Sequence, residues 1–110
     1  MPLPGFVSFL HRASGALMFA VGIPALLWGL QASTASPETF AEFKAILAHP
    51  LARLVLLGLV WAYLHHLFAG LRHLALDLHM GTELGAARRS SAAVFVLALL
   101  LTAIVGVRLW

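Results

Sequence analysis

Apolar residues run through this chain in three long blocks separated by short polar stretches. The first block carries no charged residue from 13 to 37, and the second carries none from 54 to 71. The third block runs from 90 to 107. Each block reaches the roughly 18 uncharged residues that a membrane-spanning helix needs. Strands of a membrane barrel would alternate apolar and polar residues, which these blocks do not do.

The blocks predict an all-α integral membrane protein with three transmembrane helices in one domain, residues 1–110. Between the first two blocks, the Ser/Thr-rich stretch 31–37 is expected to form a loop. The apolar residues that follow it recur at helical spacing, which predicts a short amphipathic helix on the membrane surface. Ser36 supplies a cap residue for this helix, and Pro37 stands at its first position. The expected helices cover about 6–31, 37–49, 51–79 and 89–110.

Composition supports a membrane protein and excludes several other classes. Hydrophobic residues make up 62% of the chain and charged residues 10%, against roughly 25% charged in soluble domains. A soluble domain of 110 residues buries too little of its surface to hide so much apolar area. The chain has no cysteine, which excludes disulfides and iron–sulfur ligation by its own residues. The sequence has no basic stripe with exposed aromatic residues, the pattern that would indicate nucleic-acid binding.

The basic residues give the expected orientation. Basic residues favour the cytoplasmic side of a membrane, and three spans place four of them on the side of the N-terminus and three on the other side. The N-terminus is therefore expected in the cytoplasm. The first group is Arg12, Arg72, Arg88 and Arg89, and the second is Lys44, Arg53 and Arg108.

The second block ends in a group of polar residues that share one helical face. At 100° per residue, Gly70, His73 and Asp77 fall within about 40° of His66. If Asp77 lies at the water interface, His66 lies about 16 Å deeper, near the middle of a hydrocarbon core about 30 Å thick. An ionisable residue at that depth is costly and is a functional candidate by default.

Imidazole is a common axial ligand of heme iron, so His66 is our candidate metal ligand. Gly70, one turn away on the same face, would let a flat macrocycle approach the helix backbone. Two alternatives stay open. His66 could be hydrogen-bonded to a neighbouring helix without binding a cofactor, or His65, which points about 100° away, could be the ligand instead.

The start of the first block carries a second polar group. Ser8 and Arg12 are four residues apart, as are His11 and Gly15, so each pair shares a helical face. A hydroxyl and a guanidinium at the membrane surface suit a quinone carbonyl, and they suit lipid phosphate groups equally well. Heme propionates need cations at the same level. The candidates to supply them are His11, Arg12, Arg72 and His73.

Both motifs together resemble the cytochrome b subunit of succinate dehydrogenase. The resemblance covers nearly the whole chain, from about Ser8 through the third block. Either motif alone is moderately specific, whereas both in this order in a three-span chain are strongly specific. They read Ser8-x-x-His11-Arg12-x-Ser14-Gly15 and His66-x-x-x-Gly70-x-Arg72-His73-x-x-x-Asp77.

The resemblance implies that the chain is one half of a heterodimeric anchor helix bundle in a bacterial cell inner membrane. One heme b would be shared with a second small anchor subunit, each subunit contributing one axial histidine, here His66. The Ser8 and Arg12 positions match a ubiquinone site, and those of His11 and Arg72 lie near the propionates. Succinate would be oxidised on a flavoprotein subunit, with electrons arriving through an iron–sulfur subunit, so this chain holds no catalytic residue for the dicarboxylate.

Two other functions are weighed against this expectation. The nearest is the anchor of a fumarate reductase, which runs the same chemistry in reverse. The other is a purely structural membrane scaffold, which would leave Ser8, His11, Arg12 and the His66 face unexplained.

Overall fold

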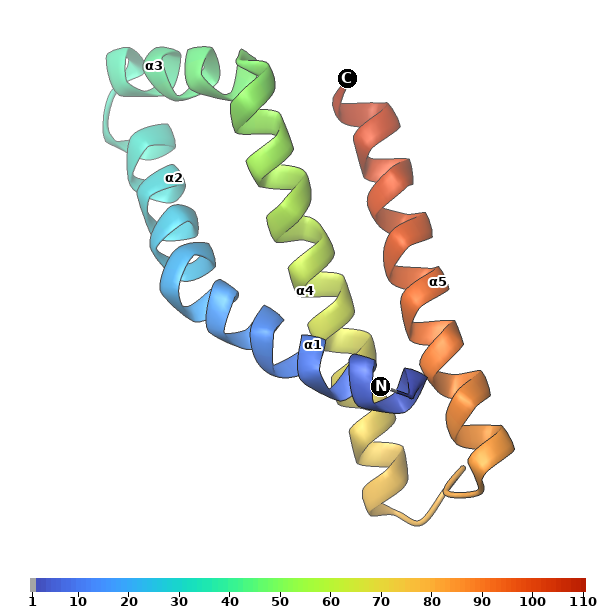
Figure 1. The fold of residues 1–110 in the computed structure, drawn as a ribbon. Helices are drawn as coiled ribbons and strands as arrows, with labels where there is room; N and C mark the ends of the chain where they lie inside the picture. The colour runs from blue at the N-terminus through green and yellow to red at the C-terminus, as the bar shows by residue number, and fades with distance from the viewer. Residues whose placement is uncertain (1) are drawn as a thin grey trace.

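The computed structural model describes residues 2–110, and these residues form helices without a single strand. Three long helical segments run up and down, and a short helix bridges the first and second at one end (Figure 1). The predicted all-α class is confirmed. In chain order the elements are α1 (Leu3–Leu17), the π-helical turn η1 (Met18–Gly22), α2 (Ile23–Ala35), α3 (Pro37–Ala48), α4 (Pro50–Asp77) and α5 (Leu84–Leu109).

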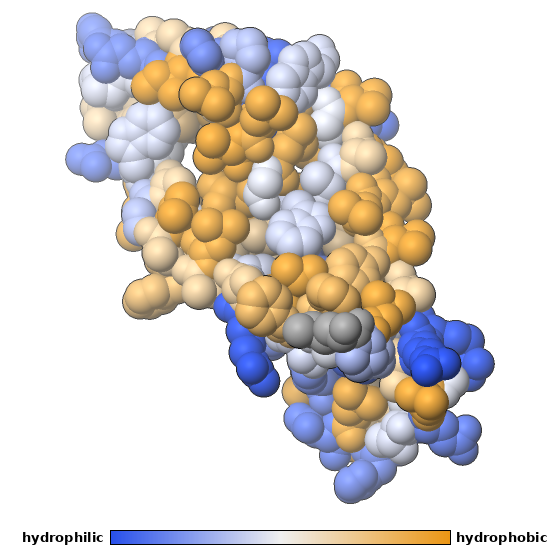
Figure 2. Space-filling view, viewed as in Figure 1, coloured by the Kyte–Doolittle hydropathy of each residue, from blue (hydrophilic) through white to orange (hydrophobic). Residues whose placement is uncertain are grey.

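Three of the helical segments are long and apolar enough to cross a membrane: Leu3–Ala35, Pro50–Asp77 and Leu84–Leu109. Only 11% to 17% of the residues in their most apolar stretches are buried within the chain. The remaining apolar side chains form a broad hydrophobic band between hydrophilic ends (Figure 2). A surface of this kind is stable only against lipid or other membrane helices. The chain is a multi-pass membrane protein, as predicted.

The first span bends in its middle, where η1 interrupts the α-helical hydrogen bonding between α1 and α2. The bend has an identifiable cause in Pro24, just after the π-helical turn. Proline has no backbone N–H, and its ring clashes with the carbonyl four residues earlier, that of Ala20. A π-helical turn accommodates that clash by widening the helix locally.

The first span is also longer than expected. The prediction of a loop at 31–37 is wrong, because α2 continues to Ala35 and only Ser36 separates it from α3. The hydroxyls of Ser33 and Thr34 donate to the carbonyl of Leu30, at 3.1 and 2.7 Å. These bonds back to the preceding turn satisfy the side chains without ending the helix.

The start of α3 follows the predicted capping. Ser36 Oγ accepts a hydrogen bond from the Thr39 N–H, and Thr39 Oγ1 accepts one from the Ser36 N–H, both at 3.1 Å. This reciprocal capping box satisfies two backbone donors that a helix start leaves free. Pro37 occupies the first helical position, as expected.

The α4–α5 connection is shorter than the sequence suggested. Helix α4 ends at Asp77, and the turn that follows places His79 and Gly81 at positive φ, 59° and 67°. Helix α5 then begins at Leu84, five residues before the expected start near 89, so Arg88 and Arg89 belong to its first turns.

Small residues allow the spans to pack closely. The buried core joins Val7 of α1, Ala69 of α4 and Val94 of α5, with Phe68 and Phe95 packed against it. Ala62, Ala98, Ser14 and Ser91 are also buried. Close approach through small side chains is how helices associate in a bilayer, where burying apolar area gains little. The core lies where α1 crosses α4, which positions the polar residues described next.

Candidate functional site

Three histidines from α1 and α4 meet at this crossing. The rings of His11 and His66 are stacked, with centroids 4.3 Å apart and planes inclined by 11°. His73 lies 5.0 Å from His11 at 50°. The sequence placed His66 and His73 on one helical face, and the crossing adds His11 from the other motif. Among the described residues, no group of three or more His, Cys, Asp or Glu side chains is suited to hold a metal ion.

The hydrogen bonds of His66 determine which ring nitrogen is free. Its Nδ1 lies 3.1 Å from the carbonyl oxygen of His11 and 3.4 Å from Ser14 Oγ. A carbonyl can only accept, so the bond to His11 requires a proton on Nδ1. In the neutral ring, Nε2 then carries the lone pair. Metal-binding histidines commonly use this arrangement, with one nitrogen held by a backbone carbonyl and the other free to coordinate.

Two glycines border the histidine cluster. A Cβ added to Gly15 would lie 2.9 Å from Cε1 and 3.2 Å from Nδ1 of His66, closer than side chains normally approach. The ring therefore occupies space that only a glycine leaves open. A Cβ at Gly70 would lie 3.6 Å from His11 Nε2, an ordinary contact distance. The sequence analysis assigned no site role to Gly15, although its place beside Ser14 in the first motif could have indicated one.

His65 has a different environment from its neighbour. Its ring is 0% exposed and lies between Trp61 and Phe95, at centroid distances of 5.1 and 5.5 Å. Neither of its nitrogens has a hydrogen-bond partner within the described chain. It therefore packs inside the helix bundle between Trp61 and Phe95, and its unpaired nitrogens leave it able to bind a ligand.

Ser8 and Arg12 lie on α1, one turn apart, with Ser8 half-buried and Arg12 exposed. Arg12 directly follows His11 of the histidine cluster in α1. An exposed guanidinium keeps its planar set of N–H donors available to an anionic or carbonyl oxygen. The pair therefore offers one hydroxyl and one cation near the start of the first span.

Arg72 lies on another side of α4. It is only 8% exposed, and its Nε donates to Ser90 Oγ of α5 at 2.9 Å. The Ser90 hydroxyl in turn donates a hydrogen bond to the carbonyl of Ala87 at 3.1 Å. The structure therefore uses Arg72 to join α4 to α5, while His73 next to it reaches His11. Its expected proximity to a propionate stays a prediction.

Comparisons with known proteins agree with the two motifs. The family model described as succinate dehydrogenase/fumarate reductase transmembrane subunit matches residues 1–105. The succinate dehydrogenase cytochrome b556 subunit of Paracoccus denitrificans is 38% identical over 93 residues, 84% of this chain and 71% of the relative. The subunit of the same name from Coxiella burnetii (strain RSA 493 / Nine Mile phase I) is 34% identical over 110 residues, 99% of this chain and 87% of the relative. The chain therefore belongs to the family of succinate dehydrogenase/fumarate reductase transmembrane subunits.

Proposed function

We propose that this chain is the heme b- and quinone-binding anchor of a succinate dehydrogenase, through which electrons from succinate reach ubiquinone. The observation that carries the proposal is the bond between His66 Nδ1 and the His11 carbonyl at 3.1 Å, which leaves Nε2 as a free ligand nitrogen. The cytochrome b556 names of both relatives support a heme of the b type.

His66 is the proposed axial ligand. When bound, the heme supplies a one-electron redox centre within the bilayer. Ser14 and the His11 carbonyl hold the imidazole of His66 in one orientation, and Gly15 leaves room for it. A low-spin b-type heme would take two protein ligands. His66 would supply one, and we assign the second to a histidine of a partner anchor subunit, as the family resemblance implies.

The remaining residues proposed to bind heme come from both motifs. His11 is stacked on His66, His73 lies 5.0 Å from His11, and Gly70 lies beside His11. Together with Arg12 and Arg72, the histidines can supply the N–H donors and positive charge that propionates need.

The quinone site is proposed at Ser8 and Arg12. A quinone carbonyl accepts hydrogen bonds and gains negative charge on reduction, so a hydroxyl beside a guanidinium stabilises the reduced form more than the oxidised form. Reduction also takes up two protons, which requires access to water. The exposed side chain of Arg12 near the start of the span meets that requirement.

The proposed assembly places the chain in a bacterial cell inner membrane with its N-terminus in the cytoplasm, since four of the seven basic residues lie on that side. A flavoprotein subunit oxidises succinate, and an iron–sulfur subunit carries electrons to this end of the anchor. The absence of cysteine agrees with that division of labour. A fumarate reductase anchor is the second candidate, because the matching family includes both activities.

Substitution of the two neighbouring histidines tests the proposal. His66→Ala should remove most of the heme from the purified complex, whereas His65→Ala should leave most of it in place. A pyridine hemochrome assay measures the heme, normalised to covalent or bound flavin so that assembly is counted separately. Loss of heme in the His65 variant alone would overturn the assignment of His66.

A further inference from the structure

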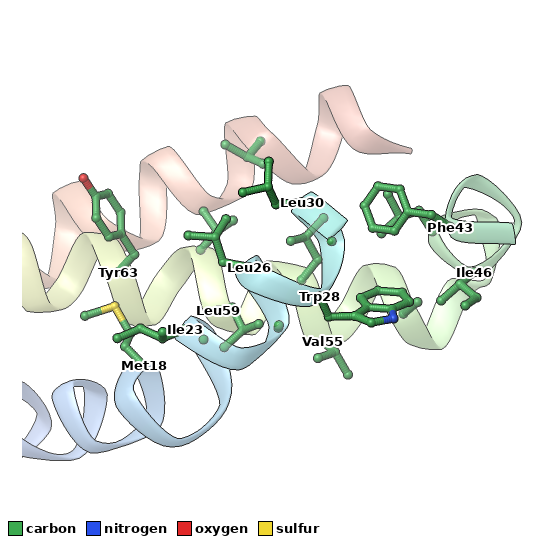
Figure 3. Close-up of a pocket in the computed structure, with 18 of the residues that line it drawn as sticks. Met18, Ile23, Leu26, Trp28, Leu30, Phe43, Ile46, Val55, Leu59 and Tyr63 are labelled. Carbon is green, nitrogen blue, oxygen red and sulfur yellow. The ribbon is translucent and has the colours of Figure 1, made fainter. Parts of the chain in front are cut away.

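A large apolar groove of about 1650 Å³ opens between α2 and α4, and it extends along α4 to Leu64, two residues before His66. Side chains of α3 and α5 complete its walls (Figure 3). Almost all of its lining is aliphatic or aromatic, so water gains no hydrogen bonds there. In a membrane such a space is filled by hydrocarbon or by another protein segment. Representative lining residues are Ile23, Leu26, Trp28, Phe43, Leu59 and Leu101.

The bend in the first span creates this groove. Met18 and Gly22 of the π-helical turn lie at its inner end, and α2 continues from there to α3. Near α3 the wall is fixed by aromatic contacts, because Trp28 packs edge-on against Phe43 at 5.3 Å. Gly29 lets that Phe43 ring approach the α2 backbone, since an added Cβ would lie 3.3 Å from it.

The length of the groove lies between the half-thickness and the full thickness of a hydrocarbon core. Along α4 it extends from Leu51 to Leu64, about 20 Å at the helical rise of 1.5 Å per residue. Half of a hydrocarbon core is about 15 Å thick. A helix that spans the membrane needs about 30 Å, more than the stretch of α4 that lines the groove, and α3 lines one end of it through Phe43 and Ile46. An extended acyl chain can lie along this length.

Positive charge gathers at the end of the groove covered by α3. Arg53, in the first turn of α4, donates from Nε to the carbonyl of Leu47 at 3.1 Å, and its guanidinium lies 5.7 Å above the Trp110 ring. That hydrogen bond uses one of five N–H groups. Arg53 itself does not line the groove, but Leu47, whose carbonyl it binds, does, as does His49. Lys44 is exposed on the same half of α3. The acidic residues of α3, Glu38 and Glu42, lie nearer its other end.

We propose that the groove is a binding site for one phospholipid of the leaflet on the α3 side. An acyl chain lies between α2 and α4, and the phosphate binds the free guanidinium nitrogens of Arg53. This site is distinct from the proposed heme and quinone residues, because none of Ser8, Arg12, His11 or His66 lines it.

Photolabelling tests the proposal on the purified complex. The probe is phosphatidylglycerol with a diazirine near the end of one acyl chain, and peptide mass spectrometry locates the labelled residues. We expect label on α2 and α4 near Leu26 and Leu59. Ala52→Trp fills the groove and should reduce that label to background, whereas Ala93→Trp, exposed on α5 outside the groove, should not. Arg53→Gln should weaken binding of the labelled lipid about fivefold, the effect of one cation on an anionic lipid.

Other occupants give different results. Because the chain has no cysteine, Leu59→Cys introduces a single thiol in this subunit. A cross-link from that thiol to another subunit would show that a protein helix fills the groove and would overturn the proposal. Loss of the label on addition of excess ubiquinone would overturn it in favour of a quinone tail. Label confined to the outer faces of the helices in the unmodified complex would also overturn the proposal, because the groove would then hold no acyl chain.

Discussion

The contact between Gly15 and His66 predicts how sensitive the site is to a single methyl group. In Gly15→Ala the new Cβ would lie 2.9 Å from His66 Cε1, where ordinary contacts begin near 3.4 Å. The imidazole must therefore move by about 0.5 Å. A shift of that size away from α1 would stretch the Nδ1 bond to the His11 carbonyl from 3.1 Å to about 3.6 Å, beyond hydrogen-bonding distance.

The lost bond sets the expected magnitude. A neutral hydrogen bond contributes about 0.5–1.5 kcal/mol net, which corresponds to roughly 2- to 10-fold in heme affinity. The substitution also exchanges glycine for the better helix former, so helix stability should rise and cannot explain a loss of heme. Gly58→Ala is the matched control, because a Cβ there meets nothing within 4 Å.

The assay is the heme-to-flavin ratio of the purified complexes after repeated detergent exchange, together with the EPR spectrum of the oxidised heme. Gly15→Ala should lose heme faster than Gly58→Ala and should shift the low-spin g-values, because the axial ring has moved. Identical retention and identical g-values in the two variants would refute the reasoning that Gly15 positions His66.

Three further predictions concern the quinone site, the α4–α5 contact and the second heme ligand. Ser8→Ala and Arg12→Leu should lower quinone reduction but leave dye-linked succinate oxidation unchanged, with Arg12→Leu the more damaging because its bond is charge-assisted; equal loss in both assays would contradict a quinone role. Ser90→Ala removes the partner of buried Arg72 and should lower the free energy of unfolding by about 0.6–1.7 kcal/mol. The thermal midpoint of the complex should then be lower than for the control Ser91→Ala, because the Ser91 hydroxyl bonds only its own helix. The isolated chain should form no stable low-spin cytochrome, and a bis-histidine spectrum from the monomer would assign the second ligand to this chain.

Local periodicity was sufficient to predict part of the site. Residues His66, Gly70 and His73 share a face because the angle between them depends only on helix geometry. The same reasoning could not place His11 against His66, since that contact depends on how α1 crosses α4. Nor could it predict that Arg72, a candidate partner of a propionate, donates to Ser90 of α5.

The helix ends were likewise predicted only where the signal was local in the sequence. The Ser36 cap was predictable because a capping box is a local pattern, and the structure contains it. The loop expected at 31–37 failed because Ser33 and Thr34 satisfy their hydroxyls within the helix. The π-helical turn before Pro24 was not predicted either, because a proline in a membrane helix can be accommodated in several ways. The apolar groove that follows from this turn is therefore visible only in three dimensions.

The most direct test of the account is an optical spectrum of the purified complex. Succinate is added first to the oxidised protein and dithionite afterwards, for the unmodified complex and for His66→Ala. If His66 holds the heme, succinate raises a b-type α-band in the unmodified complex. That band is lost, even with dithionite, in an assembled His66→Ala complex. An unmodified complex without any b-type band, or a His66→Ala complex with an unchanged one, would contradict the account.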